Sequence, residues 1–422
     1  MLFAYTRYIG TATYDRSSRV PDAADKPPPS LRMLAVLGLL LAFASISTDL
    51  FLPALPAMGI ALGAGPGTLE QAISAYLLGF AFGQLFWGPI SDRYGRRGPV
   101  ALGVLVFVIG SAGCALATDA WQLIGWRLVQ ALGASAGVAL ARAMVRDLYD
   151  RDQSARLLST LMTVMAVAPL VGPSVGAQIL ALASWRAIFW TLTAIGLLTV
   201  AAIQTLPETL PRGRRETGPL WSVFAGYREL LRNRQLVGFS AVLGFFYVGI
   251  FASVAGTPFA YISYHGLSPR LYALLFAAGV FGLMAANMVN ARLVTRVGSN
   301  RILLAGTVGA AVFGAAAALV TGTGWGGIYS LVPTLLLFTA MNGLIAANAV
   351  AGALASVPAR TGAASALLGA TQYGSGMVGA AAVGIFADGT PWPMGWVMAL
   401  AGAGSLASAL ACLARNERAA RD

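Results

Sequence analysis

Stretches of apolar residues long enough to cross a membrane recur along this chain and limit the folds open to it. Of its 422 residues, 57% are hydrophobic and only 10% are charged, whereas soluble domains carry about 25% charged residues. A spanning helix needs roughly 20 apolar residues. Twelve such stretches can be marked, at 33–56, 70–90, 99–118, 121–143, 155–182, 185–206, 236–262, 270–291, 300–321, 326–352, 362–387 and 392–414. The sequence therefore predicts an all-α membrane protein with twelve transmembrane helices.

The positions of the basic residues predict which side of the membrane each loop faces. Lys and Arg gather in the cytoplasmic loops of membrane proteins. All 28 of them except Arg127, Arg186 and Arg270 fall in tails or loops that share one side of the twelve-span arrangement. We therefore expect both termini in the cytoplasm. The net charge of +12 is then a signal of orientation and gives no reason to expect nucleic-acid binding.

A polar segment divides the apolar stretches into two sets of six. Residues 207–235 are predicted to form a cytoplasmic linker between a bundle at 33–206 and a second bundle at 236–414. Residues 1–32 and 415–422 are expected to be cytoplasmic tails. The first tail lacks the apolar core of a secretory signal.

A charged, glycine-containing motif follows the second span and recurs weakly in the second half of the chain. The motif is Gly88-x-x-x-Asp92-Arg93-x-Gly95-Arg96, and its echo is Ala291-x-x-x-Thr295-Arg296-x-Gly298. Such repeats are typical of transporters built from two pseudo-symmetric bundles with the cargo site between them. We expect a turn at 88–97 and a conformational latch formed by Gly88, Asp92, Arg93, Gly95, Arg96 and Asp147. The alternative is a set of solvated charges flanking the membrane.

Asp49 is the acidic residue that lies well inside a predicted span. A charge at that depth costs at least about 2.5–3.5 kcal/mol on insertion scales, so acids inside membranes are usually functional and face a cavity. We expect Asp49 to bind a proton and cargo. The alternative is a residue solvated from outside, beside a helix end broken by Pro53 and Pro56.

Arg127 is the arginine that falls inside a predicted span, the fourth, at about the depth of Asp49. Two interpretations remain open from the sequence. Arg127 either pairs with Asp49 or anchors itself on backbone carbonyl groups. Gln130 lies about one turn further along the same face and would extend a polar patch used in coupling.

The fifth span carries small residues and prolines at short intervals, at Pro169, Gly172, Pro173 and Gly176. Glycines four residues apart let neighbouring helix backbones approach closely, and proline kinks a helix. Tight packing of this span is the simplest consequence.

Four segments together resemble one branch of a known transporter family, the bicyclomycin/chloramphenicol-resistance (Bcr/CflA) branch of the major facilitator superfamily. They are 48–56, 81–97, 142–148 and 362–369. The resemblance implies the twelve-helix major facilitator fold, the bacterial inner membrane and export of small amphiphilic drugs in exchange for protons. It also implies a coupling role for Asp49 and Arg127. The element from Pro169 to Gly176 resembles the antiporter motif of such exporters, which favours export over the alternative of a proton-coupled uptake symporter.

Aromatic residues in several spans are candidates for lining a drug cavity, although each could equally pack in the core or anchor at the lipid interface. The candidates are Tyr76, Phe80, Trp126, Tyr247 and Tyr261. The chain has one histidine, two cysteines far apart in sequence and no phosphate-binding loop. We therefore expect no enzyme, cofactor or metal site. The expected partners are the lipid bilayer, a small-molecule drug and protons, and the protein is expected to be a monomer.

Overall fold

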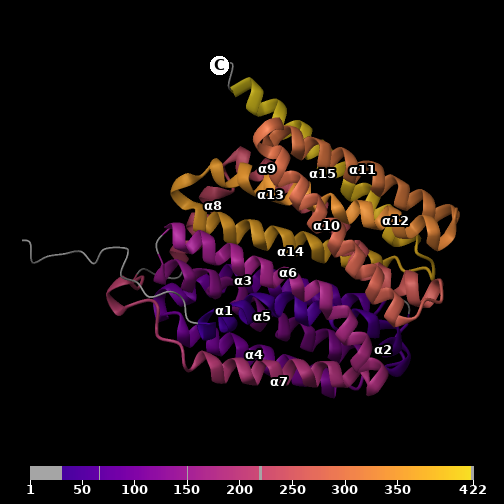
Figure 1. Ribbon diagram of the computed structural model, residues 1–422, viewed down its shortest axis with the longest axis horizontal. Helices are drawn as coiled ribbons and strands as arrows, with labels where there is room; N and C mark the ends of the chain where they lie inside the picture. The colour runs from indigo at the N-terminus through magenta and orange to yellow at the C-terminus, as the bar shows by residue number, and fades with distance from the viewer. Residues whose placement is uncertain (1–30, 66, 150, 218–220, 420–422) are drawn as a thin grey trace, which may run out of the picture.

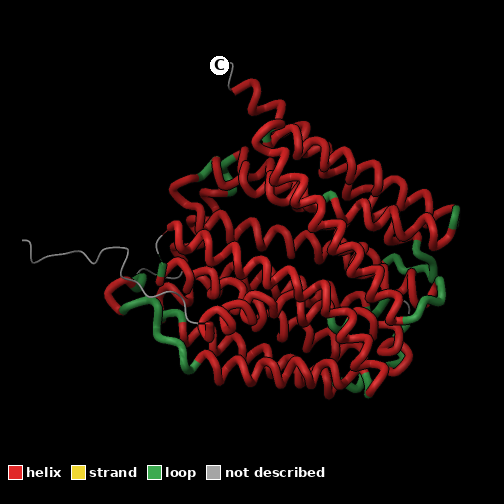
Figure 2. Tube along the Cα trace, in the orientation of Figure 1, coloured by secondary structure: helices red, strands yellow, loops and turns green. Residues whose placement is uncertain are grey.

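The computed structural model describes residues 31–65, 67–149, 151–217 and 221–419, which form helices joined by short loops (Figure 2). The predicted tails lie outside this range except for residues 31–32 and 415–419. Ten helices in the described range are long and apolar enough to span a membrane. The prediction of an all-helical membrane protein is confirmed.

The helices before the linker lie on one side of the molecule and those after it on the other (Figure 1). The first set is α1 (Leu31–Asp49), η2 (Leu52–Ala54), α2 (Leu55–Ala61), α3 (Glu70–Tyr94), α4 (Arg97–Leu116), α5 (Ala120–Leu148), α6 (Arg151–Leu182) and α7 (Trp185–Ile203). Between the sets are η3 (Arg212–Arg214) and α8 (Trp221–Leu230). The second set is α9 (Arg234–Pro258), η4 (Phe259–Tyr264), α10 (Pro269–Val297), α11 (Ser299–Thr323), α12 (Gly327–Ala340), α13 (Asn342–Ala355), η5 (Pro358–Arg360), α14 (Thr361–Ile385) and α15 (Trp392–Ala419).

Two predicted spans are interrupted. The first span consists of α1, a turn, the 3₁₀ helix η2 and α2, because Pro53 and Pro56 each lie in the first turn of a new helix, where the missing proline N–H does not matter. The break directly follows Asp49. The span predicted at 326–352 is likewise divided, into α12 and α13 on either side of Met341.

The prediction of a turn over residues 88–97 was wrong, because α3 continues through most of this segment. The helix runs to Tyr94 with Pro89 inside it, and only Gly95 and Arg96 separate it from α4. The polar end of α3 is a continuation of the helix beyond its apolar part. Gly95 ends it with φ +94°, a backbone conformation that favours glycine.

The weak sequence repeat corresponds to a repeated structure. Gly298 ends α10 with φ +90° in the same way as Gly95 ends α3, and α11 starts directly after it. The two sets of helices thus use the same helix–glycine–helix connection after their second span.

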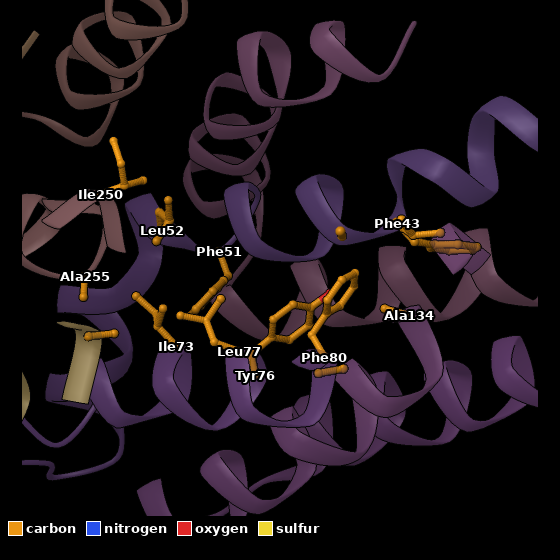
Figure 3. Packing of buried hydrophobic residues seen from close by; sticks show 14 of the residues in the cluster. Phe43, Phe51, Leu52, Ile73, Tyr76, Leu77, Phe80, Ala134, Ile250 and Ala255 are labelled. Carbon is orange, nitrogen blue, oxygen red and sulfur yellow. The ribbon is translucent and has the colours of Figure 1, made fainter. Parts of the chain in front are cut away.

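The two sets of helices meet along α3 and α14, which run beside each other through the middle of the molecule (Figure 1), and along α6 and α10. At one end of the first seam, Gln71 Nε2 donates to the carbonyl oxygen of Ala381 over 3.2 Å. Further along it, the ring centroids of Phe80 and Tyr373 lie 4.3 Å apart. Figure 3 shows the packed interior beside this seam, where Phe51 and Tyr76 lie close together.

Candidate functional site

Asp49 is the last residue of α1 and is 7% exposed. A Cβ atom added to Gly172 of α6 would lie 3.0 Å from the Asp49 Cβ, so α6 packs directly against this residue. Among the described residues, no Lys, Arg or His nitrogen lies within ion-pairing distance of the Asp49 carboxylate. Asp49 is thus a buried acid at a helix break that faces α6 without an ion-pair partner in the described part of the chain.

Arg127 is fully buried on α5, and its side chain binds the end of α1 beside Asp49. Its Nη1 atom donates to the carbonyl oxygen of Ser47 over 2.9 Å and to Gln130 Oε1. Its guanidinium carbon lies 4.1 Å from the ring centroid of Phe51 and 4.2 Å from that of Tyr76. The sequence left two interpretations of Arg127 open. In the structure Arg127 is anchored on a backbone carbonyl group and is not paired with Asp49.

The geometry of α1 explains why Arg127 and Asp49 do not pair. Successive helical residues are rotated by about 100°, so positions 47 and 49, which are two residues apart, point to different sides of α1. Arg127 contacts Ser47 and Phe51, and Asp49 faces Gly172. The sequence predicted a common depth for Asp49 and Arg127. Depth alone did not determine which side of α1 carries Asp49 and which side contacts Arg127.

A polar network extends from Arg127 into the interior of the first helix set. Gln130 Nε2 donates to Ser111 Oγ over 2.7 Å, and the hydroxyl groups of Ser47 and Tyr76 share a hydrogen bond of 2.5 Å. These bonds fix the guanidinium plane and the end of α1. Gln130 therefore lies beside Arg127, as the sequence predicted.

The small residues of the fifth span lie where α6 contacts the break in α1. Gly172 faces Asp49, and a Cβ atom on Gly176 would overlap the carbonyl group of Leu50. Pro169 and Pro173 both lie inside α6. The structure thus brings the predicted antiporter element and the predicted coupling acid into direct contact.

The five aromatic candidates do not form one cluster. Tyr76 and Phe80 are buried beside the α3–α14 seam. Trp126 is 36% exposed and packs over Gly113 of α4. Tyr247 and Tyr261 belong to the second helix set, the first on α9 and the second on η4.

Tyr261 lines a cavity of about 90 Å³ between α9, α10 and α12. Its lining also includes Ser253, Thr257, Tyr272 and Thr339. Tyr272 is fully buried and close enough to Asp49 for the two to interact electrostatically. Sequence reasoning did not select Tyr272, because nothing local distinguishes it from an interfacial tyrosine near the start of a span.

Three of the six predicted latch residues, Asp92, Arg96 and Asp147, form an ion-pair cluster. The Arg96 guanidinium group donates to Asp92 Oδ1 at 2.5 Å, to Ser91 Oγ at 2.6 Å and to Asp147 Oδ2 at 2.7 Å. These contacts join α3, α4 and α5 within the first helix set. Gly88 has open space where a side chain would be, and Arg93 stacks over the Tyr94 ring at 5.9 Å.

Glu208 completes this cluster and was not identified from the sequence. Its carboxylate accepts hydrogen bonds from the backbone N–H groups of Arg96 at 2.8 Å, Leu210 at 3.0 Å and Arg97 at 3.2 Å. It thereby caps the start of α4, where backbone N–H groups lack helical partners. Burial alone would raise the pKa of Glu208, but these amide hydrogen bonds and the nearby Arg215 hold it below its usual value.

The fold and the site define a class of protein. Two helix sets joined by a linker, a repeated connection after the second span of each, and a buried acid at a helix break near the seam are features of a secondary transporter. The chain belongs to the Major Facilitator Superfamily, whose family profile matches residues 37–380. It is a multi-pass membrane transporter and not an enzyme.

Relatives of known sequence support this assignment. The chain is 33% identical to the MFS-type transporter YdgK of Bacillus subtilis over 87% of this chain and 92% of that protein. It is 28% identical to a bicyclomycin resistance protein homolog of Haemophilus influenzae, over 86% and 92% of the two chains. The solved structure of a peptide transporter, POT, has the same fold, with a TM-score of 0.73 at 14% identity over 94% and 97% of the two chains.

Proposed function

We propose that this transporter is a drug:proton antiporter of the Bcr/CflA branch, which exports small amphiphilic compounds across the bacterial inner membrane. A relative that covers most of the chain is named for bicyclomycin resistance. The antiporter element of α6 supports export, because its Gly172 and Gly176 contact α1 at Asp49 and Leu50.

The observation that carries the proposal is the position of Asp49. It is a buried acid at the break in α1, without an ion-pair partner among the described residues, and Tyr272 of the second helix set is within electrostatic range. A buried carboxylate without a counter-ion is costly. Its charge can be neutralised by a proton or by a cationic group of the cargo, and the two compete.

The proposed cycle follows from this competition. In the inward-open state, cargo displaces the proton from Asp49, and the two helix sets then rock against each other along the α3–α14 and α6–α10 seams. On the outer side a proton replaces the cargo, and the protonated form returns. The ligands shift the equilibrium between the states only because they bind those states with different affinity. The proposed coupling residues are Asp49, Arg127 and Gln130.

Everted membrane vesicles with an acidic interior test the direction of transport. Antiport predicts that a cationic drug such as ethidium, added outside, enters while protons leave, so that a pH-sensitive dye reports a rise in internal pH. Asp49→Asn should abolish this signal, and the exposed Glu229→Gln should leave it unchanged. Proton uptake together with drug, or no drug-dependent proton movement in wild type, would contradict the proposal and favour a symporter of the same fold.

A further inference from the structure

Arg142 is a partly buried cation that the proposed exchange at Asp49 does not use. It lies on α5, 15 residues after Arg127 and so roughly 22 Å further toward the predicted cytoplasmic end. Its Nε atom is shielded from solvent and has no hydrogen-bond acceptor among the described residues. The nearest acid along α5, Asp147, is bound to Arg96. A donor that is shielded from water and lacks an acceptor is costly, so the Nε atom of this side chain has capacity for a hydrogen-bonding ligand.

The opposite helix set presents an unpaired acceptor to the same region. Asn342, the first residue of α13 after the break in that span, has a buried Oδ1 atom without a hydrogen-bond donor among the described residues. Its amide lies beside the Tyr247 hydroxyl group. Tyr373 of α14 lies within electrostatic range of both Tyr247 and Arg142. Two tyrosines thus connect an unused donor in one helix set to an unused acceptor in the other.

An aromatic surface borders these polar groups. The Tyr373 ring lies 4.3 Å from Phe80 and 6.1 Å from Phe251, measured between centroids, and Phe251 lies 6.1 Å from Tyr247. The rings of Tyr247, Phe251 and Tyr373 are partly exposed and can pack against an aromatic ligand, whereas Phe80 is fully buried behind Tyr373. One turn beyond Arg142, the exposed Arg146 adds positive charge toward the predicted cytoplasmic end, which attracts anions from that side.

We propose that Arg142, Tyr247, Asn342 and Tyr373 form a subsite for the carboxylate end of a zwitterionic aromatic cargo, separate from Asp49. The guanidinium group matches a carboxylate with paired, charge-assisted hydrogen bonds. Asn342 Oδ1 accepts a hydrogen bond from a donor group on the same molecule, and the rings contact its aromatic part. The inference rests on the proposed function in treating this ligand as cargo. It adds that the protein selects compounds carrying an anionic group as well as a cationic one.

Calorimetric titration of the purified full-length protein tests the subsite without reference to transport direction. The probes are norfloxacin, a zwitterion, and its methyl ester, which keeps the amine and lacks the carboxylate. Wild type should bind norfloxacin at least tenfold more tightly than the ester, and Arg142→Gln should weaken norfloxacin binding by roughly tenfold or more while leaving ester binding unchanged. Arg142→Lys should retain part of the preference, and Arg212→Gln, at an exposed position in η3, should retain all of it.

Equal effects of Arg142→Gln on both probes, no effect on either, or absence of norfloxacin binding by wild type would overturn the subsite. Ethidium-driven proton release from vesicles keeps the two proposals distinguishable. Suppose that Arg142→Gln still releases protons with ethidium, and that wild type does not prefer norfloxacin to its ester. The subsite is then wrong, and the antiport mechanism is unaffected.

Discussion

Replacing Arg127 by lysine should destabilise the protein more than replacing it by methionine, although lysine keeps the charge. Arg127 is fully buried, and its guanidinium group lies between the rings of Phe51 and Tyr76 while donating to the Ser47 carbonyl and to Gln130. A lysine ammonium group is compact and shorter in reach, so it cannot lie flat against both rings while donating to both acceptors.

The magnitudes follow from these contacts. Loss of one hydrogen bond from a charged group costs about 1.5–3 kcal/mol, and loss of one desolvated cation–π contact costs about 1–2 kcal/mol. Arg127→Lys still buries a charge, so the free energy of unfolding should fall by roughly 2–4 kcal/mol. Arg127→Met loses the same contacts but also removes a desolvation penalty of several kcal/mol. It should therefore be the more stable variant by about 2 kcal/mol.

Thermal unfolding of the two variants in the same detergent, compared with wild type, measures this order. Both variants should transport poorly, because each loosens the end of α1 beside Asp49. A lysine variant as stable as wild type, or more stable than the methionine variant, would show that the stacked guanidinium geometry does not matter and would refute this reasoning.

Two further predictions concern the cap on α4 and the packing of α6. Glu208→Gln should lower the free energy of unfolding by about 1–2 kcal/mol, as for other lost helix caps. The folded-state pKa of Glu208 is depressed by the amides of Arg96, Leu210 and Arg97. The difference from wild type should therefore be fully present at neutral pH and shrink only below about pH 4.5 in stability curves; a difference that grows on acidification would be inconsistent with the cap. Gly176→Ala should reduce transport at least tenfold, because overpacking against α1 costs about 1–3 kcal/mol. The control is Gly125→Ala, which should transport normally because a Cβ atom at Gly125 would lie in open space.

Hydrophobic length and charge distribution were enough to predict the helical membrane fold. The apolar segments are long, and a helix satisfies its backbone hydrogen bonds within its own segment. The spanning helices could therefore be predicted without knowledge of tertiary contacts. The same reasoning failed at 88–97, where polarity suggested a turn but the helix continues to Tyr94. Polarity reports the environment of a residue and does not determine where its helix ends.

The candidate site was predictable as far as its residue types and depths. Asp49 and Arg127 are conspicuous because charges are costly inside a membrane, but their lack of an ion pair depends on the side of α1 that each faces. Glu208 was not predictable, because its partners Arg96 and Arg97 lie more than 100 residues earlier in the chain. Arg142 was taken for one of the cytoplasmic basic residues, because its position near the end of a predicted span does not reveal that its Nε atom is shielded from solvent.

Proton release on cargo binding tests the central claim most directly. Purified protein is mixed with ethidium in weakly buffered detergent near neutral pH, and the protons released are counted per bound ligand. Wild type should release up to one proton for each ethidium bound, and Asp49→Asn should bind ethidium without releasing any. Ethidium binding to wild type without proton release, or equal release from the Asp49→Asn variant, would contradict exchange at Asp49.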